Sequence, residues 1–371
     1  TVGSIGVGGG GAAGVFGYRD GGGRKKAVGR FGGSQATESS VEAALRWLAR
    51  HQEKDGQWIA SKYEVTLPHG NVQKLTVGCT GLALLAFLGA GYTENSGQFA
   101  DNVRRAQAWL LKQQKDNGGV YDQCGGGSTN ATGYVHAVTS LALAEAYGMS
   151  KNPALKAAAQ RAVDYSLKTH QVPYSGWRYD AREAADLSVT GWFVMQLKSA
   201  KIAGLTVDGS GFQGAATFLN EVTDKDGQAR YTREKYPSPS MTAVGMVCRQ
   251  FMGTPSNDPL LQAGAAHLVK RLPAWIPEKS RTHEDFYYWY YGTLAMFQMG
   301  GDKWTKWNEA LKPTLVNNQC KGGPLDGSVN DKDGSWDPNG YYDQHGGRVY
   351  TTALGALTLE VYYRYLPMYA K

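Results

Sequence analysis

The sequence predicts an all-α fold, an α/α toroid in which six helical hairpins close into an (α/α)6 barrel. The first observation is the stretch 188–205, which reads as a helix about 27 Å long at ~1.5 Å per residue and carries apolar side chains around most of its circumference. A helix that is apolar nearly all round is usually buried on several sides. The second observation is that comparable stretches recur at 77–91, 136–148, 241–253, 286–300 and 350–366.

The third observation is the regular spacing of these buried helices. When one equivalent residue is taken from each, the intervals lie between 49 and 61 residues. Periods near this size mark stacked supersecondary units, none of which can bury its apolar face alone. An open superhelix is the alternative to a closed ring. The equivalent residues are Thr80, Thr139, Thr190, Thr242, Tyr291 and Thr352.

A more polar, amphipathic helix precedes each buried helix and is expected in an outer ring. In the first of these, Trp47 and Leu48 belong to the apolar stripe, and Ser39 or Ser40 can cap its start. The turn at Asp55 and Gly56 then leads to the inner helix. The outer helices are expected at 39–52, 106–121, 155–171, 211–222, 259–272 and 304–319.

The N-terminal segment differs in composition from the remainder, so we divide the chain into an arm, 1–38, and a toroid domain, 39–371. Fourteen of the first 35 residues are glycine, and such composition usually gives a flexible, extended chain. An ordered arm needs contacts along its length, because fixing each residue costs about 1–2 kcal/mol. We expect it to dock on its own barrel or, in a homo-oligomer or polymer, on the next subunit. Its expected anchors are Ile5, Val7, Val15, Phe16 and Tyr18.

Composition and charge narrow the function classes. The formal net charge is +7, but the first 35 residues hold five basic residues and one acidic residue. The toroid domain therefore lacks the basic excess that nucleic-acid binding requires. No apolar run reaches the ~18 residues that a membrane span needs. The four cysteines are far apart, and their redox state stays open. A chain that starts at Thr1 fits a processed, exported protein, secreted or at the cell envelope.

Four turns carry a resemblance to a known family. Gln52 with Gly56-Gln57-Trp58, Gln114 with Gly118-Gly119-Val120-Tyr121, Gln171 with Gly176-Trp177, and Gln319 with Gly334-Ser335-Trp336 look like the QW repeats of squalene–hopene cyclases. Residues 39–369 resemble bacterial proteins of the prenyltransferase and squalene-oxidase repeat class. The resemblance implies the same toroid, and it implies that the Gln and Trp side chains tie helix ends together. Because one fold hosts many roles, it does not assign an activity.

The acidic motif of the cyclases is missing. In that family a DxDD motif protonates the substrate, whereas the nearest stretch here is Asp331-Lys332-Asp333-Gly334, with Asp337 following in the same loop. We therefore expect no cyclisation of squalene or of shorter polyprenyl substrates.

A metal site is a weak prediction. Protein prenyltransferase subunits, which resemble this fold, hold zinc with Asp, Cys and His, and Asp122, Cys124 and His136 offer the same residue types. Three ligands and a water would suit catalytic zinc. The alternative is a structural turn, which the related turn beginning at Asp343 favours. We expect no stoichiometric zinc and no cofactor.

Carboxylates and aromatic residues are the other candidates. Carbohydrate-active enzymes on similar barrels need two carboxylates at one cleft, and Glu183, Asp186, Glu284 and Asp285 precede buried helices. They would equally complement helix dipoles. The candidate cavity-lining residues could bind an apolar chain or a carbohydrate ring, or could simply fill the core. They are Tyr134, Trp192, Tyr287, Tyr288, Trp289, Tyr290 and Tyr291.

Two functions follow as hypotheses. The one we favour from the sequence is a non-catalytic, secreted or cell-surface toroid that assembles into a ring or filament through its arm. The alternative is an enzyme of the terpenoid cyclase or prenyltransferase-like class, or a carbohydrate-active enzyme, with an aromatic-lined cavity. The centre of the barrel discriminates between them, because a substrate cavity should be open and lined by convergent polar groups.

Overall fold

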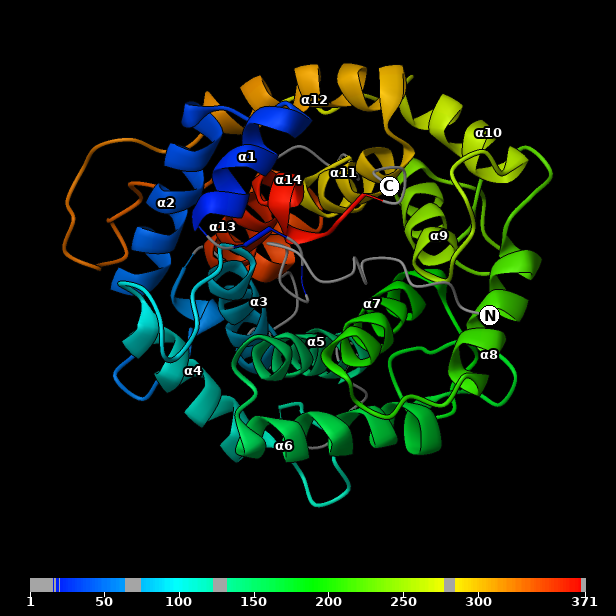
Figure 1. Ribbon diagram of the computed structural model, residues 1–371, viewed down its shortest axis with the longest axis horizontal. Helices are drawn as coiled ribbons and strands as arrows, with labels where there is room; N and C mark the ends of the chain where they lie inside the picture. Colours follow the sequence, from blue (N-terminus) through cyan, green and yellow to red (C-terminus); the bar gives the residue numbers. More distant parts are fainter. Residues whose placement is uncertain are drawn as a thin grey trace.

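Two concentric rings of helices form the structure, a computed structural model that describes residues 16, 18, 19, 21–63, 75–122, 132–276 and 284–367. Figure 1 looks along the axis that the rings share. Each inner helix packs against the next, and the last packs against the first, so the ring is closed. The inner helices are α3 (Thr76–Gly89), α5 (Thr132–Ser150), α7 (Leu187–Ala203), α9 (Pro239–Phe251), α11 (Phe286–Met299) and α13 (Asp343–Leu359).

The outer ring contains the amphipathic helices, so the predicted α/α toroid of six hairpins is confirmed, and the open superhelix is not formed. The described residues form no β-strand, only isolated bridges. The described residues also form short helices in addition to those of the two rings: η1 (Ala60–Lys62), the π-helical η3 (Tyr165–His170) and α14 (Val361–Arg364). The outer helices are α2 (Gln35–Arg50), α4 (Ala100–Gln113), α6 (Pro153–Asp164), α8 (Ser210–Val222), α10 (Pro259–Leu268) and α12 (Gly301–Val316).

Glutamine side chains link consecutive hairpins, as the resemblance implied. The amide of Gln52 donates to the carbonyl oxygens of Gly56 in its own turn and Asn102 in the next outer helix, at 3.0 and 2.9 Å. Gln114, Gln171 and Gln319 repeat this pair of bonds. The motif tryptophans are also structural, since the indole nitrogen of Trp177 donates to the Ser166 carbonyl at 2.8 Å.

A second recurring contact corrects two of the equivalent positions chosen from the sequence. In the first four repeats the backbone N–H that follows the turn donates to a side chain of the inner helix, as Trp58 does to the Thr80 hydroxyl at 3.0 Å. In the second repeat the acceptor is His136, three residues before Thr139. In the sixth, Thr351 rather than Thr352 bonds to the turn, through the carbonyl of Trp336.

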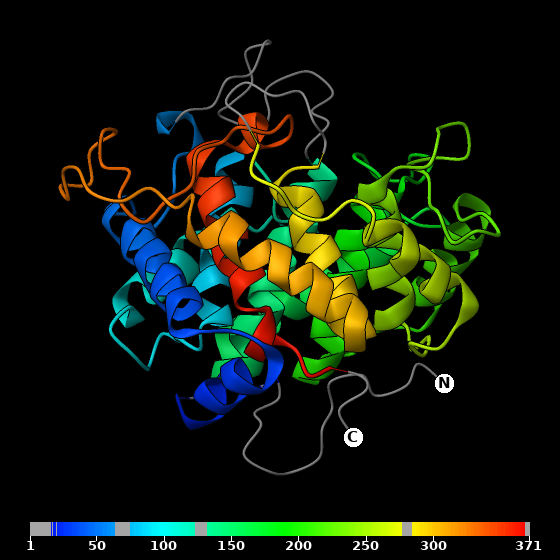
Figure 2. The ribbon, with the colours of Figure 1, turned by 90° about the horizontal axis from the view of Figure 1, so that it is seen from above.

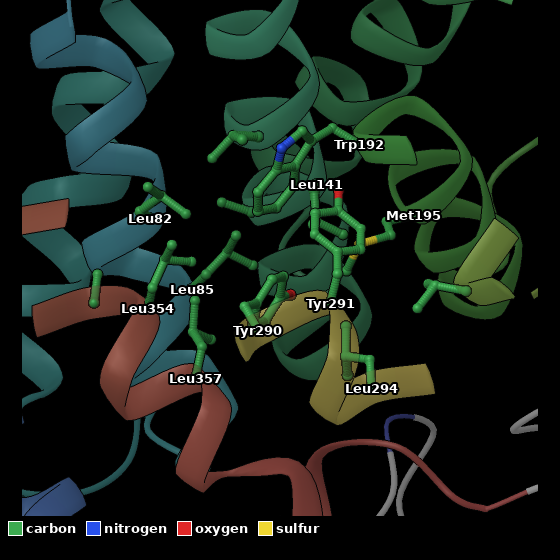
Figure 3. Close-up of a cluster of buried hydrophobic side chains, with 14 of the residues drawn as sticks. Leu82, Leu85, Leu141, Trp192, Met195, Tyr290, Tyr291, Leu294, Leu354 and Leu357 are labelled. Carbon is green, nitrogen blue, oxygen red and sulfur yellow. The ribbon is translucent and has the colours of Figure 1, made fainter. Parts of the chain in front are cut away.

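Packed side chains fill the centre of the barrel (Figure 3). Leucines of α3, α5 and α13 meet Trp192 of α7 and the aromatic residues of α11 there. The ring of Trp192 stacks on Tyr290 with centroids 5.6 Å apart and meets Tyr291 edge-on. All three side chains are buried, so the centre is a hydrophobic core.

The two ends of the barrel differ. The end at which α7, α11 and α13 begin is called the mouth here, and the end at which the inner helices finish is called the base. Figure 2 shows α1 (Gly21–Phe31) and the red C-terminal residues together at the base.

Part of the region expected as an extended arm is therefore helical, because 21–31 form α1. The apolar side chains of Ala27, Val28 and Phe31 are buried there. The first outer helix also begins earlier than the expected residue 39. The first outer helix starts at Gln35, since Ser34 and Thr37 form a reciprocal capping box. Ile5, Val7 and Val15 lie outside the described residues.

Candidate functional site

Hydroxyl groups from three inner helices meet at the mouth. The Tyr134 hydroxyl, from α5, donates to the Ser188 hydroxyl at 2.8 Å. Ser188, at the start of α7, lies 2.6 Å from the Tyr287 hydroxyl of α11. The first turn of an inner helix brings each of these residues to the same end, so residues 99 positions apart in sequence become neighbours.

Asp186 is a buried carboxylate beside this hydroxyl cluster. Its Oδ1 atom caps α7 by accepting the Val189 N–H at 2.8 Å. Its Oδ2 atom lies 3.8 Å from the Nε atom of Arg178 and has no hydrogen bond of ordinary length within the described residues. Burial raises the pKa of Asp186 to about 7, even though the cap bond opposes the shift. The carboxyl group therefore holds a proton to a higher pH than an exposed aspartate does.

Two tyrosines line the approach to Asp186. The hydroxyl groups of Tyr179 and Tyr231 hydrogen bond to each other. Burial, and then the charge of Asp186, raise the pKa of the Tyr231 hydroxyl. Tyr179 packs on Tyr134 with ring centroids 5.8 Å apart. The side chains of Tyr231, Tyr179 and Tyr134 thus form a continuous series of contacts from the neighbourhood of Asp186 to the hydroxyl cluster.

Asp285 and Asp343 form a buried carboxyl pair at the same end. Asp285 caps α11 through the Tyr287 N–H at 3.2 Å and accepts the Tyr342 N–H at 2.9 Å. Asp343 accepts the Gly340 N–H at 2.9 Å through Oδ2. Gly340 leaves room for the pair, because a Cβ atom there would collide with both carboxylates. Both aspartates are fully buried.

The electrostatics of this pair favour a protonated acid. Burial raises the pKa of Asp285 to about 7. The pKa of Asp343 lies well above its ordinary value, through burial and then through the charge of Asp285. Two adjacent buried carboxylates cannot both ionise cheaply, so one proton stays on the pair at neutral pH. The Oδ1 atom of Asp343 is buried and has no partner among the described residues.

Exposed aromatic side chains lie near the pair, since the Tyr342 N–H donates to Asp285. Tyr341 and Tyr342 are 41% and 43% exposed, which marks the rim of the mouth. The ring of Tyr342 lies 6.1 Å from that of Tyr287, measured between centroids. The mouth therefore combines exposed rings, linked hydroxyl groups and buried acids.

The structure divides the seven candidate cavity-lining aromatics into three groups. Tyr134 and Tyr287 belong to the mouth, and Trp192, Tyr290 and Tyr291 belong to the filled centre. Tyr288 and Trp289 face away from the centre. Tyr288 packs on Trp307 of the outer helix α12, and Trp289 packs on Trp275.

The carboxylates chosen from the sequence also separate. Asp186 and Asp285 are at the mouth, whereas Glu183 and Glu284 form partly exposed ion pairs with Arg178 and Arg271. Sequence reasoning treated the turn at Asp343 as structural and missed its carboxyl group. Its position just before a buried helix, matching Asp186 and Asp285, was the available signal.

The structure describes two of the three metal-ligand candidates, and both have hydrogen-bond partners in the protein. His136 uses both ring nitrogens, because Nδ1 accepts the Val120 N–H at 3.1 Å and Nε2 lies 2.9 Å from the Ser166 hydroxyl. Asp122 accepts the Val77 N–H at 3.3 Å. Cys124 is outside the described residues. No group of three or more His, Cys, Asp or Glu side chains with metal-binding geometry occurs among the described residues.

Comparisons with known proteins support the fold. A model of the squalene–hopene cyclase C-terminal domain matches residues 26–138. A comparison with curated protein sequences finds no match. The chain thus has a squalene–hopene cyclase-like α/α toroid, in agreement with the resemblance drawn from its turns. No helix among the described residues is long and apolar enough to cross a membrane.

Solved structures share this fold at low sequence identity. Cellobiose 2-epimerase from Bacillus thermoamylovorans superposes with a TM-score of 0.60 at 12% identity, covering 91% of this chain and 99% of that one. A type II terpene cyclase from Scytonema, bound to geranylgeranyl dihydroxybenzoate, gives 0.57 at 14%, covering 88% and 97%. An α-amylase from Clostridium perfringens gives 0.59 at 12%, covering 87% and 98%. These similarities establish the fold alone.

Proposed function

We propose that this chain is a carbohydrate-active enzyme whose substrate binds at the mouth of the toroid. The observation that carries the proposal is the Asp285–Asp343 pair, two fully buried carboxyl groups beside an aromatic rim. Burying two like charges side by side is costly for folding, and ordinary helix capping requires only one of them. An acid held protonated near neutral pH is the group that general acid catalysis needs.

The chemistry assigned to the mouth is proton transfer at a sugar oxygen. Tyr341 and Tyr342 offer ring faces on which a sugar can stack, and the hydroxyl groups of Tyr134, Ser188 and Tyr287 offer hydrogen bonds. The Asp285–Asp343 pair supplies a proton to the leaving or ring oxygen. Asp186, in its ionised form, serves as the base. In hydrolysis, a water molecule would add to the anomeric carbon and pass a proton to Asp186, while the C1–O bond to the leaving group breaks and the leaving oxygen takes the proton of the Asp285–Asp343 pair.

A carbohydrate fits this site better than a polyprenyl chain. Trp192, Tyr290 and Tyr291 fill the centre of the barrel, where a long apolar substrate would have to lie. A ligand at the mouth meets hydroxyl groups and carboxyl groups instead. The solved toroids include a cellobiose 2-epimerase and an α-amylase, whose names refer to carbohydrate substrates. This similarity supports the choice of a carbohydrate.

The test uses the full chain and conservative variants. Asp343→Asn and Asp186→Asn remove the acid but keep an oxygen acceptor, and Asn caps helices about as well as Asp. Asp258→Asn is the matched control, because Asp258 caps the outer helix α10. The chain is incubated with gluco-, cello- and manno-oligosaccharides, and reducing ends and epimers are measured. We expect turnover that falls by ~10²–10⁴ in the two mouth variants and not in the control. Turnover that survives in both mouth variants, or no turnover and no binding of any sugar, contradicts the proposal.

The non-catalytic toroid is the second candidate. The filled centre favours it, because it removes the deep cavity that the enzyme alternative was expected to need. In this function the buried aspartates would serve only as helix caps, and the chain would assemble outside the cell or on its surface. The sugar assay separates the two candidates, since a purely structural toroid neither turns over nor binds the oligosaccharides.

A further inference from the structure

The base of the toroid holds a short N-terminal segment in a site shaped for it. Phe16 and Arg19 are 4% and 7% exposed, although they precede the first helix. The backbone N–H of Tyr18 donates to the Tyr363 carbonyl at 2.9 Å. The segment is thus bound through both its backbone and its side chains. This contact is separate from the mouth and from the chemistry proposed there.

Arg19 is recognised by groups that the barrel supplies. One of its terminal nitrogens donates to Glu145 Oε2 at 2.8 Å and to the Leu88 carbonyl at 3.2 Å. The other donates to the Arg364 carbonyl at 3.2 Å. A planar guanidinium with several fixed donors suits this set of oxygens, whereas a lysine could not reach all of them.

Glu145 is a buried carboxylate that other hydrogen bonds hold in position to bind the Arg19 guanidinium. It is fully buried in α5 and also accepts bonds from Arg364 at 3.2 Å and from the Tyr365 hydroxyl at 2.9 Å. Burial alone would raise the pKa of Glu145, but the charges of Arg19 and Arg364 lower it to about 2. The carboxylate therefore stays ionised and matches a positively charged ligand.

Two glycines of the barrel leave space for the same segment, because they have no side chain. A Cβ atom at Gly148 would collide with the ring of Phe16. A Cβ atom at Gly91 would collide with the Arg19 carbonyl, and Gly91 has a φ of 93°, which glycine adopts without strain. The barrel surface thus contacts the Phe16 ring, the Tyr18 backbone N–H and the Arg19 side chain and carbonyl.

Helix α1 and a short connection after it join the segment to the first outer helix. α1 ends at Phe31, and α2 begins at Gln35. Gly32, with a φ of 90°, lies between them. A glycine connection can redirect a docked helix, and exchange of an identical element between copies is a common route to oligomers.

We propose that the base is a binding site for the Phe16–Arg19 segment and that it accepts this segment from a second copy of the chain. Within one copy the same segment occupies the site, so exchange replaces each contact by its equivalent. Because the donor end of one copy would fill the receptor of the next, the arrangement is reciprocal in a dimer and head-to-tail in a longer assembly.

A peptide-binding experiment tests the site. The receptor is the full chain with Phe16→Ala and Arg19→Ala, whose own segment is weakened while Glu145 keeps Arg364. A fluorescent peptide of residues 14–31 is titrated and its anisotropy measured. We expect at least tenfold tighter binding to this receptor than to the wild-type chain. Peptides with Phe16→Ala or Arg19→Ala should bind at least tenfold more weakly. Equal binding of all three peptides, or none to a receptor with a native circular dichroism spectrum, overturns the proposal.

A cross-linking experiment tests exchange between copies. One full chain carries Phe16→Cys and a second carries Ala203→Cys, because the side chains of Phe16 and Ala203 both lie next to Gly148. Each chain carries only one of the two new cysteines, so a disulfide between them can form only between two chains. We expect a disulfide between the two chains after mixing at high concentration, suppressed by excess peptide 14–31. Absence of that cross-link while the peptide binds overturns exchange and restricts the site to its own chain.

Discussion

The side-chain amide of Gln319 donates to the backbone carbonyl of Ser40 at 2.8 Å, across 279 residues of sequence. The same amide donates to the Gly334 carbonyl at 2.7 Å. Gln52, Gln114 and Gln171 make the equivalent bond from one hairpin to the next. In the sixth it joins the last hairpin to the first, so this bond closes the outer ring.

We predict that Gln319→Ala lowers the free energy of unfolding by about 1–3 kcal/mol, because it leaves buried carbonyl oxygens unpaired. Denaturant unfolding followed by circular dichroism measures the loss. Gln213→Ala is the control, since Gln213 is exposed on α8 and its removal should change stability by less than ~0.5 kcal/mol. Equal effects of the two substitutions would show that ring closure does not depend on this amide.

The raised pKa of Asp186 predicts that the free energy of unfolding depends on pH. Its pKa is raised from 3.8 to about 7 in the folded chain, so between these values the folded state holds a proton that the unfolded state releases. This contribution is complete below about pH 4 and is lost as the pH rises through 7. Each pH unit changes the free energy of unfolding by about 1.4 kcal/mol.

Asp186→Asn cannot titrate, so the stability of the wild type relative to this variant should fall by up to about 4 kcal/mol between pH 4 and pH 7. Urea unfolding at several pH values measures the difference. Arg178, Tyr231 and the histidines are unchanged in the variant, so their own titrations largely cancel. A difference that stays constant or rises with pH would contradict a raised pKa.

Substitution of Trp192 tests how much the packed centre of the barrel contributes to the free energy of unfolding. We expect Trp192→Ala to cost about 3–5 kcal/mol, because it removes a large buried ring and leaves a cavity. Indole should restore part of the lost stability by binding the folded state only. Thermal unfolding with and without indole measures both effects. Trp109→Ala, at a half-buried position on α4, is the control and should show no response to indole.

His136 bears on the metal prediction, which the structure leaves as a prediction. Burial lowers the pKa of His136 well below its ordinary value, and both nitrogens are engaged by Val120 and Ser166. We expect less than 0.1 zinc per chain when the protein is purified with zinc present, as elemental analysis would show. One zinc per chain, lost in Cys124→Ala, would contradict this expectation.

The fold could be predicted because periodicity and turn chemistry pointed the same way. Helices such as 188–205 are apolar all round, and the Gln and Trp of each turn bond to backbone in a repeated pattern. The helix at 21–31 could not be predicted, because its glycines disfavour a helix. Tertiary contacts decide the outcome there, including the Arg24–Glu38 ion pair at 2.6 Å.

The site was less predictable, because it depends on which inner helices become neighbours. Asp186 and Asp285 were found from their positions before buried helices. The pairing of Asp285 with Asp343 needs α11 and α13 side by side and needs Gly340 between them. The direction in which Tyr288 and Trp289 point depends on the rotation of α11, which an all-aromatic run does not reveal.

The packing of α2 against α13 has a consequence for biosynthesis. The indole of Trp47 in α2 donates to the carbonyl of Asp331, 284 residues later. At ~5–20 residues per second, translation separates the two by roughly 15–60 s. During that time the nascent chain exposes the apolar stripe of α2, which a chaperone at the ribosome exit would have to cover.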